Sequence, residues 1–239
     1  MKKQLFTALV AMLLGVSYTA PVQAQAIAAP KQSVSVFLGG AVALGHSGLT
    51  EQQADPLSEG NDALEWGNLA GSYGVQYLYH FQPRWALGLE YNGNFFDDAT
   101  QTRGIFLPPF GVWERDIDTR MDVHNIMAAG RFTLNPQSGF RFYVPFGAGI
   151  ARSKATLEVT ENNLFPAVHN HERYTGKDTS LAYYLGFGME KQFTEHFAWG
   201  LEMRYQAFWF NNAKYSLPGA SGKERHGYIS ALLKVAYLF

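Results

Sequence analysis

Bulky apolar residues alternate with small or polar ones over much of this chain. In the segments 85–92 and 197–206 the odd positions hold Trp, Leu, Phe, Met or Tyr, and the even positions hold Gly, Ala or polar residues. Successive side chains of an extended strand point to opposite faces, so each segment predicts a strand with one apolar face. In a soluble sandwich the other face would be strongly charged, whereas here it carries Gly, Ala, Ser, Gln and single charges. The pattern favours a sheet whose apolar face meets lipid.

Eight segments follow this period of two. They are 33–44, 66–81, 84–96, 118–134, 140–151, 179–193, 196–210 and 227–239. The connections at 82–84, 135–139 and 194–196 are short, those at 46–65, 97–117, 152–178 and 211–226 are long, and the two kinds alternate. Outer-membrane barrels have an even number of strands, short periplasmic turns and longer external loops, and closure of the sheet pairs every backbone amide, as hydrocarbon requires. We therefore predict an all-β fold, an eight-stranded antiparallel up-and-down transmembrane β-barrel with both termini on the periplasmic side.

The N-terminal segment has the pattern of an export signal. Lys2 and Lys3 precede an apolar run over 5–16, and small residues follow up to an Ala-x-Ala-like site at 22–26. A membrane anchor would need about 20 apolar residues, so we interpret residues 1–24 as a secretory signal peptide. Cleavage is expected after Ala24, with Ala26 as the alternative. The barrel domain then covers 25–239, and we expect it in the bacterial outer membrane.

Composition excludes several kinds of site. The chain has no cysteine, which rules out a disulfide framework, a thiolate metal site and a Cys nucleophile. Its formal net charge of −1 gives no basic surface that would indicate nucleic acid as a partner. We expect no cofactor.

The lumen of an eight-stranded barrel is only wide enough to be filled by side chains. The inward face is predicted to carry seven ionisable residues, namely Glu90, Arg131, Arg141, Glu190, Glu202, Arg204 and Lys234. The same face carries Gln76, His80, Asn92, Tyr143, Tyr184 and Gln192. An uncompensated ion in such an interior costs several kcal/mol, so we expect these charges to pair and to close the lumen. A conducting pathway lined by them is the alternative.

Aromatic residues are expected to form two girdles at the level of the lipid headgroups. Those near the short turns are Tyr79, Phe81, Trp85, Phe193, Phe197, Trp199, Tyr237 and Phe239. Those toward the long loops are Trp66, Phe95, Phe208 and Trp209.

The final segment 227–239 ends on Phe239 and carries Tyr237 two residues earlier. It resembles the terminal signature by which outer-membrane barrels are recognised by their assembly machinery. Together with the segments 85–91 and 144–150, it makes the chain similar to the family of small outer-membrane β-barrel proteins that includes OmpA-like and opacity-like domains. The resemblance implies an assembly signal at Tyr237 and Phe239, and partners that include the barrel assembly machinery, outer-membrane lipids and lipopolysaccharide. We also expect no peptidoglycan-binding domain after the barrel.

Enzymatic activity is not expected. Lipid A deacylases of similar size carry a His-x-Ser pair on a late strand, whereas the comparable stretch here is Arg204-Tyr205-Gln206. A hydrolytic Ser needs an adjacent base, and His226 lies too far along its strand from Ser230 for direct proton transfer. We predict a structural or adhesive surface protein with a closed polar lumen. A lipid-modifying enzyme and a small passive pore are the alternatives.

The long connections offer three candidate features. An apolar run carries Ile105, Phe106, Leu107, Phe110 and Trp113, and such a patch often marks an interaction site. It is a candidate contact for an external protein or a host ligand; alternatively it folds over the barrel mouth or extends the neighbouring strands. Glu51, Asp55, Glu59, Asp62 and Glu65 form an acidic loop that matches no calcium-loop spacing. His169 and His171 could share a metal ion, but a solvated pair is favoured.

Overall fold

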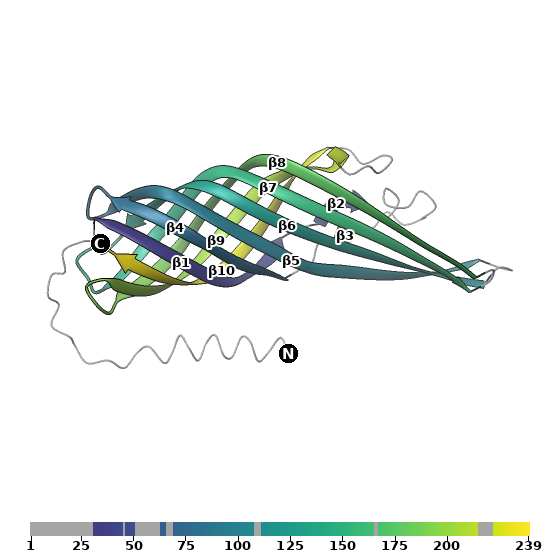
Figure 1. The fold of residues 1–239 in the computed structure, drawn as a ribbon, viewed down its shortest axis with the longest axis horizontal. Helices are drawn as coiled ribbons and strands as arrows, with labels where there is room; N and C mark the ends of the chain where they lie inside the picture. The colour runs from purple at the N-terminus through teal and green to yellow at the C-terminus, as the bar shows by residue number, and fades with distance from the viewer. Residues whose placement is uncertain are drawn as a thin grey trace.

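The computed structural model describes residues 31–44, 46–50, 63–65, 69–107, 111–164, 167–214 and 222–239. Eight antiparallel strands close into a barrel in the order β1-β10-β9-β8-β7-β6-β5-β4 (Figure 1). Their bounds are β1 Gln32–Leu44, β4 Leu69–His80, β5 Trp85–Leu107, β6 Gly111–Thr133, β7 Phe140–Leu164, β8 Ala167–Gln192, β9 Phe197–Asn211 and β10 Lys223–Leu238. The predicted eight-stranded up-and-down barrel is confirmed. Residues 1–24, where we expect the signal peptide, lie outside the described residues.

Three small elements lie between the barrel strands in sequence. β2 (His46–Thr50) pairs with β3 (Ala63–Glu65) in a separate two-stranded sheet, and a 3-10 turn, η2, covers Asn212–Lys214. Among the residues that the structure describes, no helix is long and apolar enough to cross a membrane.

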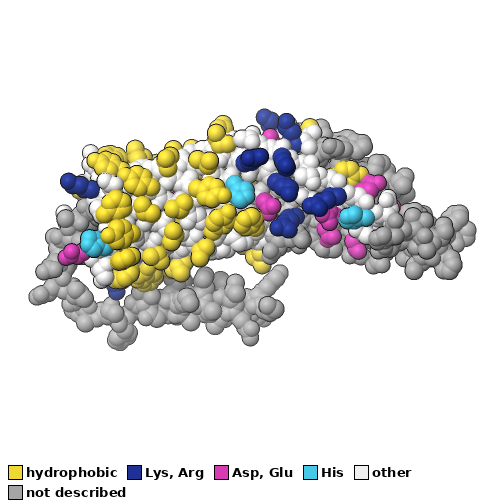
Figure 2. Space-filling view, in the orientation of Figure 1, with side chains coloured by type: hydrophobic (Ala, Val, Ile, Leu, Met, Phe, Trp, Pro, Cys, Tyr) yellow, Lys and Arg dark blue, Asp and Glu magenta, His cyan; other side chains and the backbone are white. Residues whose placement is uncertain are grey.

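The outer wall of the barrel is a belt of large apolar side chains (Figure 2). Leu38, Ile126 and Leu181 are 67%, 67% and 71% exposed. The other face is largely buried, as the alternation of buried and exposed residues over 228–238 of β10 shows. Exposed apolar surface of this extent is unfavourable in water and favourable against lipid chains. The structure therefore has the apolar face outside and the small or polar face inside.

Aromatic side chains stand at the turn end of this belt. Trp85, Phe197 and Tyr237 are all exposed, and Tyr237 contacts the ring of Phe197 with 5.2 Å between centroids. The prediction for Phe208 was wrong, because its even position on β9 turns it inward, where it is 1% exposed. Trp66, which we placed in the same girdle, lies outside the described residues.

Inward glycines make room for large rings in the narrow lumen. Three aromatic residues stand directly opposite a glycine on the next strand, in the pairs Phe37–Gly74, Tyr143–Gly188 and Tyr184–Gly147. A Cβ atom at Gly188 would lie 2.3 Å from the Tyr143 ring, far inside van der Waals contact. Each ring therefore lies across the space that a side chain on the neighbouring strand would fill.

Two of the predicted long loops are instead strands. β5 and β6 remain paired out to Leu107 and Gly111, and β7 and β8 remain paired out to Leu164 and Ala167. The loops predicted at 97–117 and 152–178 were wrong for a physical reason. We searched for an apolar row along each strand. A strand that has left the lipid needs no such row, because its outward face meets water, and water together with the neighbouring strand satisfies its backbone hydrogen bonds.

Candidate functional site

Five inward side chains form a closed ring of polar contacts in the lumen. Gln76 donates to Glu90 at 2.8 Å, and Lys234 donates to Gln76 at 2.5 Å. Nζ of Lys234 lies 3.8 Å from Oε2 of Glu202. Arg204 closes the ring, because it forms ion pairs with both Glu202 and Glu90, the latter at 2.5 Å.

This ring spans the barrel from wall to wall. Arg204 lies on β9 and Glu90 on β5, which are four strands apart in a barrel of eight. Arg204 is also clamped between aromatic faces, with its guanidinium 4.5 Å from the ring centre of Tyr184 and 4.9 Å from that of Phe37. A planar guanidinium suits both kinds of contact at once. At this level the lumen is therefore bridged by the Arg204 guanidinium, which contacts two carboxylates and two aromatic rings.

A second group of ions lies nearer the short turns. Arg131 contacts Glu190 through two hydrogen bonds of 2.8 and 3.1 Å, the bidentate geometry that gives arginine its strong carboxylate pairing. Arg141 lies 4.0 Å from the same carboxylate and donates to Gln192. Arg131 also stacks on Tyr143, with 3.9 Å between the guanidinium and the ring centre. All seven ionisable residues that the sequence assigned to the lumen are thus buried, and each forms an ion pair with at least one of the others.

A third layer toward the external end consists of uncharged polar side chains. Asn125 donates to Asn92 at 2.7 Å, and Asn94 donates to the Tyr228 hydroxyl at 2.9 Å. Sequence reasoning did not single out Asn94, Asn125 or Tyr228, although each shares the inward parity of its strand. A cavity of about 10 Å³ beside Arg204 and Asn92 has room for about one water molecule. The described lumen is therefore a packed polar core.

Beyond the barrel, four strands continue as an external sheet. The pairing of β4 with β5 ends at Ala70–Phe96, and that of β8 with β9 ends at Ala182–Phe208. Past these points β5, β6, β7 and β8 remain paired and project beyond the rest of the barrel (Figure 1). We call this part, residues 97–107, 111–118, 158–164 and 167–174, the external sheet.

The candidate contact residues belong to the tip of this sheet. Ile105 stands opposite Trp113, Phe106 opposite Val112 and Leu107 opposite Gly111. Phe110 lies outside the described residues. The apolar run is therefore part of a β-hairpin. This agrees with the alternative in which the segment extends the neighbouring strands.

A family model described as "Outer membrane protein beta-barrel domain" matches residues 8–221 of the chain. The chain belongs to this family. It is thus a bacterial outer-membrane β-barrel protein, with the short turns on the periplasmic side and the external sheet outside the cell. A comparison with curated proteins gives no match.

Several solved outer-membrane structures are similar to this barrel protein. Neisserial surface protein A shares 14% identity over 87% of this chain and 97% of its own, with a TM-score of 0.47. The attachment invasion locus protein of Yersinia pestis shares 16% over 87% and 99%, with a TM-score of 0.42. OprG of Pseudomonas aeruginosa shares 10% over 88% and 97%, with a TM-score of 0.39.

The seam of the barrel joins its last strand to its first. Phe239 and Gln32 exchange two backbone hydrogen bonds of 2.9 and 3.0 Å, and the pairing runs on from Ser33–Leu238. The Tyr237 ring packs against Phe239, with 5.8 Å between centroids. The two residues expected to act as the assembly signal therefore lie at the periplasmic end of the closing seam.

The remaining candidate residues are not brought together into a site. His171 contacts Thr160 on the external sheet, with 3.1 Å between Nδ1 and Oγ1, and His169 stands opposite Asn162. Within the described ranges no three His, Asp or Glu residues form a group that could hold a metal ion. Glu65 lies on β3, and the other four acidic residues of the first loop, Glu51, Asp55, Glu59 and Asp62, lie outside the described residues.

Proposed function

We propose that this outer-membrane barrel is a non-conducting surface protein that binds an external protein or host ligand through its external sheet, in a structural or adhesive role. The observation that carries the proposal is the continuation of β5 to β8 as paired strands beyond the apolar belt. A barrel that served only as a membrane plug would not need two such hairpins. The packed lumen supplies a rigid base for them.

The geometry of the external sheet suits binding. In the pairs between described residues, β5 beyond Phe96 and β8 before Ala182 each have a partner strand on one side only. Such edges carry backbone donors and acceptors that an extended partner segment can pair with. The sequence of the tip is apolar, with Ile105 and Trp113 among its residues, and apolar runs of this kind often mark interaction sites.

The proposal is tested by shortening one hairpin. Residues 101–117 are replaced by Asn-Gly, a sequence that favours a tight hairpin turn, so that Thr100 and Asp118, which are already opposite one another, are joined directly. A second variant, Ile105→Ser with Trp113→Ser, keeps the hairpin length. Bacteria displaying equal amounts of each protein are tested for attachment to cultured host cells and to purified extracellular proteins.

We expect both variants to attach less than the unchanged protein. Loss of attachment in the shortened variant alone would assign binding to the strand edges and not to the apolar tip. Undiminished attachment of the shortened variant, or no attachment by the unchanged protein, would contradict the proposal.

We propose no enzymatic role. Arg204, at the place where the deacylases carry their catalytic pair, is held by Glu90 and Glu202 in the lumen. His226 and Ser230 are both buried on β10, four positions apart on a strand. Mass spectrometry of lipid A from cells with and without the protein tests this directly, and a protein-dependent change in acylation would favour the enzyme.

A further inference from the structure

The outward surface of β6, β7 and β8 changes from apolar to basic within a few residues. Ile126, Ile150 and Leu181 stand side by side in one row across the three strands and are 67%, 54% and 71% exposed. The next outward positions toward the external end carry Arg152, then Lys154 opposite Lys177. In Figure 2 the dark blue side chains gather directly beside the yellow belt.

We call Arg120, Arg152, Lys154, Arg173 and Lys177 the basic patch. Arg120 is 3.6 Å from Asp122, and Arg173 is 3.2 Å from Glu158, so two of the five charges are compensated. The other three are exposed, and no described carboxylate forms an ion pair with them.

The register places two of these free charges against each other. Lys154 and Lys177 are direct cross-strand partners, an arrangement in which like charges destabilise a sheet. Arg152 stands on the same face, two residues from Lys154. An anion bound between the three side chains would remove this repulsion.

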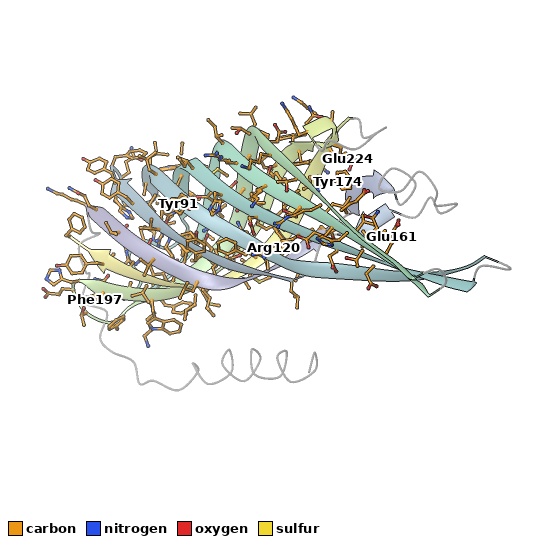
Figure 3. All side chains as sticks on the ribbon, turned by 45° about the vertical axis from the view of Figure 1, so that its right-hand side comes forward. Tyr91, Arg120, Glu161, Tyr174, Phe197 and Glu224 are labelled. Atoms are coloured by element: carbon orange, nitrogen blue, oxygen red, sulfur yellow. The ribbon has the colours of Figure 1, made fainter. Side chains whose placement is uncertain are left out.

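The patch lies at the level of the lipid headgroups. On one side of it Tyr91 contacts His124, with 2.9 Å between the hydroxyl and Nδ1, and Tyr73 stacks on Phe95. On the other side Tyr183 packs against Trp209, with 5.9 Å between centroids. Amphipathic rings favour the membrane interface, so these two clusters mark the outer boundary of the hydrocarbon. Figure 3 shows Phe197, Tyr91, Arg120 and Glu161 in this order from the turn end toward the external end.

We propose that the basic patch binds the phosphorylated headgroup of a lipid A molecule in the outer leaflet. Arg152, Lys154 and Lys177 would contact its phosphates, while its acyl chains lie along Ile126, Ile150 and Leu181. The continuity of the patch with the apolar row favours a lipid over a soluble anion, because only a lipid uses both surfaces. The site is distinct from the external sheet edges and the apolar tip invoked above.

The test compares two charge-matched double variants of the full-length protein purified from bacterial outer membranes in uncharged detergent. Lys154→Gln with Lys177→Gln neutralises the patch. Lys31→Gln with Arg84→Gln removes the same charge from exposed residues at the periplasmic end. Arg152→Gln serves as a second patch variant. Binding of diphosphoryl, monophosphoryl and dephosphorylated lipid A is measured by native mass spectrometry, together with the shift each lipid produces in the unfolding temperature.

We expect the patch variant to bind diphosphoryl lipid A about thirtyfold more weakly, since each of the two lost lysines contributes about 1 kcal/mol to binding at an anionic lipid surface. The control variant should bind it as the unchanged protein does, and dephosphorylated lipid A should bind weakly to all four proteins. Without lipid, the patch variant should be about as heat-stable as the unchanged protein, because Lys154 loses both its repulsion from Lys177 and its attraction to Asp122, which stands opposite it on β6. Bound lipid should then raise the unfolding temperature of the unchanged protein more than that of the patch variant.

Equal affinity of the patch and control variants for lipid A would overturn the proposal. Displacement of the lipid by equimolar inorganic phosphate would assign the site to a free anion. If a sulfated oligosaccharide bound more tightly than lipid A, and the patch variant lost that binding, the site would be assigned to a polysaccharide. Either of these last two results would also overturn the lipid A proposal.

Discussion

Glu202 is a buried carboxylate that neutralises charge on two cations of the lumen. It is 1% exposed and forms ion pairs with Arg204 and Lys234. It also accepts a hydrogen bond of 3.0 Å from the Tyr143 hydroxyl. Its removal takes away the ion-pair partner of Lys234 and leaves Arg204 with Glu90 alone. A buried charge without compensation costs far more than the loss of an exposed pair.

We therefore expect Glu202→Ala to destabilise the barrel by roughly 3–5 kcal/mol. Urea unfolding in lipid vesicles, followed by tryptophan fluorescence, measures this effect. Glu195→Ala is the control, because Glu195 is an exposed carboxylate in a short turn. An unfolding midpoint of Glu202→Ala equal to that of the control would mean that the lumen charges contribute nothing to stability.

Gly188 tests the role of the inward glycines. A methyl group there meets the Tyr143 ring at 2.3 Å, whereas one at Gly71 meets no atom within 4 Å. We expect Gly188→Ala to lower stability by about 1–3 kcal/mol through overpacking, and Gly71→Ala to leave it nearly unchanged. Unfolding midpoints in the same vesicles distinguish the two, and equal midpoints would argue that the Tyr143 ring moves aside at no cost.

At the scale of the element, β10 closes the barrel and carries the proposed assembly signal. Deletion of Phe239 removes the two backbone hydrogen bonds with Gln32 and the ring beside Tyr237. We expect reduced insertion into the outer membrane, measured as the fraction of protein recovered from that membrane in folded form. Phe193→Ala, which removes another exposed ring at the same end, is expected to insert normally. Undiminished insertion of the truncated protein would count against an assembly role for Phe239.

The whole molecule is expected not to conduct ions. Side chains from opposite walls meet in the lumen through Arg204 and Glu90, and eight strands leave little further width. Planar bilayers containing the purified protein should therefore show no steady conductance above that of the bare membrane. A stable conductance that changes ion selectivity in Arg204→Gln would place a pathway through the lumen and contradict the closed core.

The sequence determined which residues face lipid and which face the lumen. That division depends only on the period of two along each strand, a local property of the extended backbone. It was therefore sufficient to predict eight strands, an apolar outer wall and an inward set of Glu, Arg and Lys residues. Phe208 shows the limit of the argument, since we placed it by its position near a loop and not by its parity.

Only the tertiary structure decided which partners meet. Arg204 reaches Glu90 across the lumen from a strand 114 residues away, and Tyr143 fits over Gly188 because of the register between β7 and β8. Both depend on the stagger of the strands around the closed wall, which no single segment encodes. Tertiary structure also decided the length of the β5–β6 and β7–β8 hairpins. Outside the lipid these strands pair with each other and need no apolar row, so the sequence pattern does not mark where they end. The basic patch arises in the same way, since the register between the consecutive strands β6, β7 and β8 decides which of its charges stand side by side.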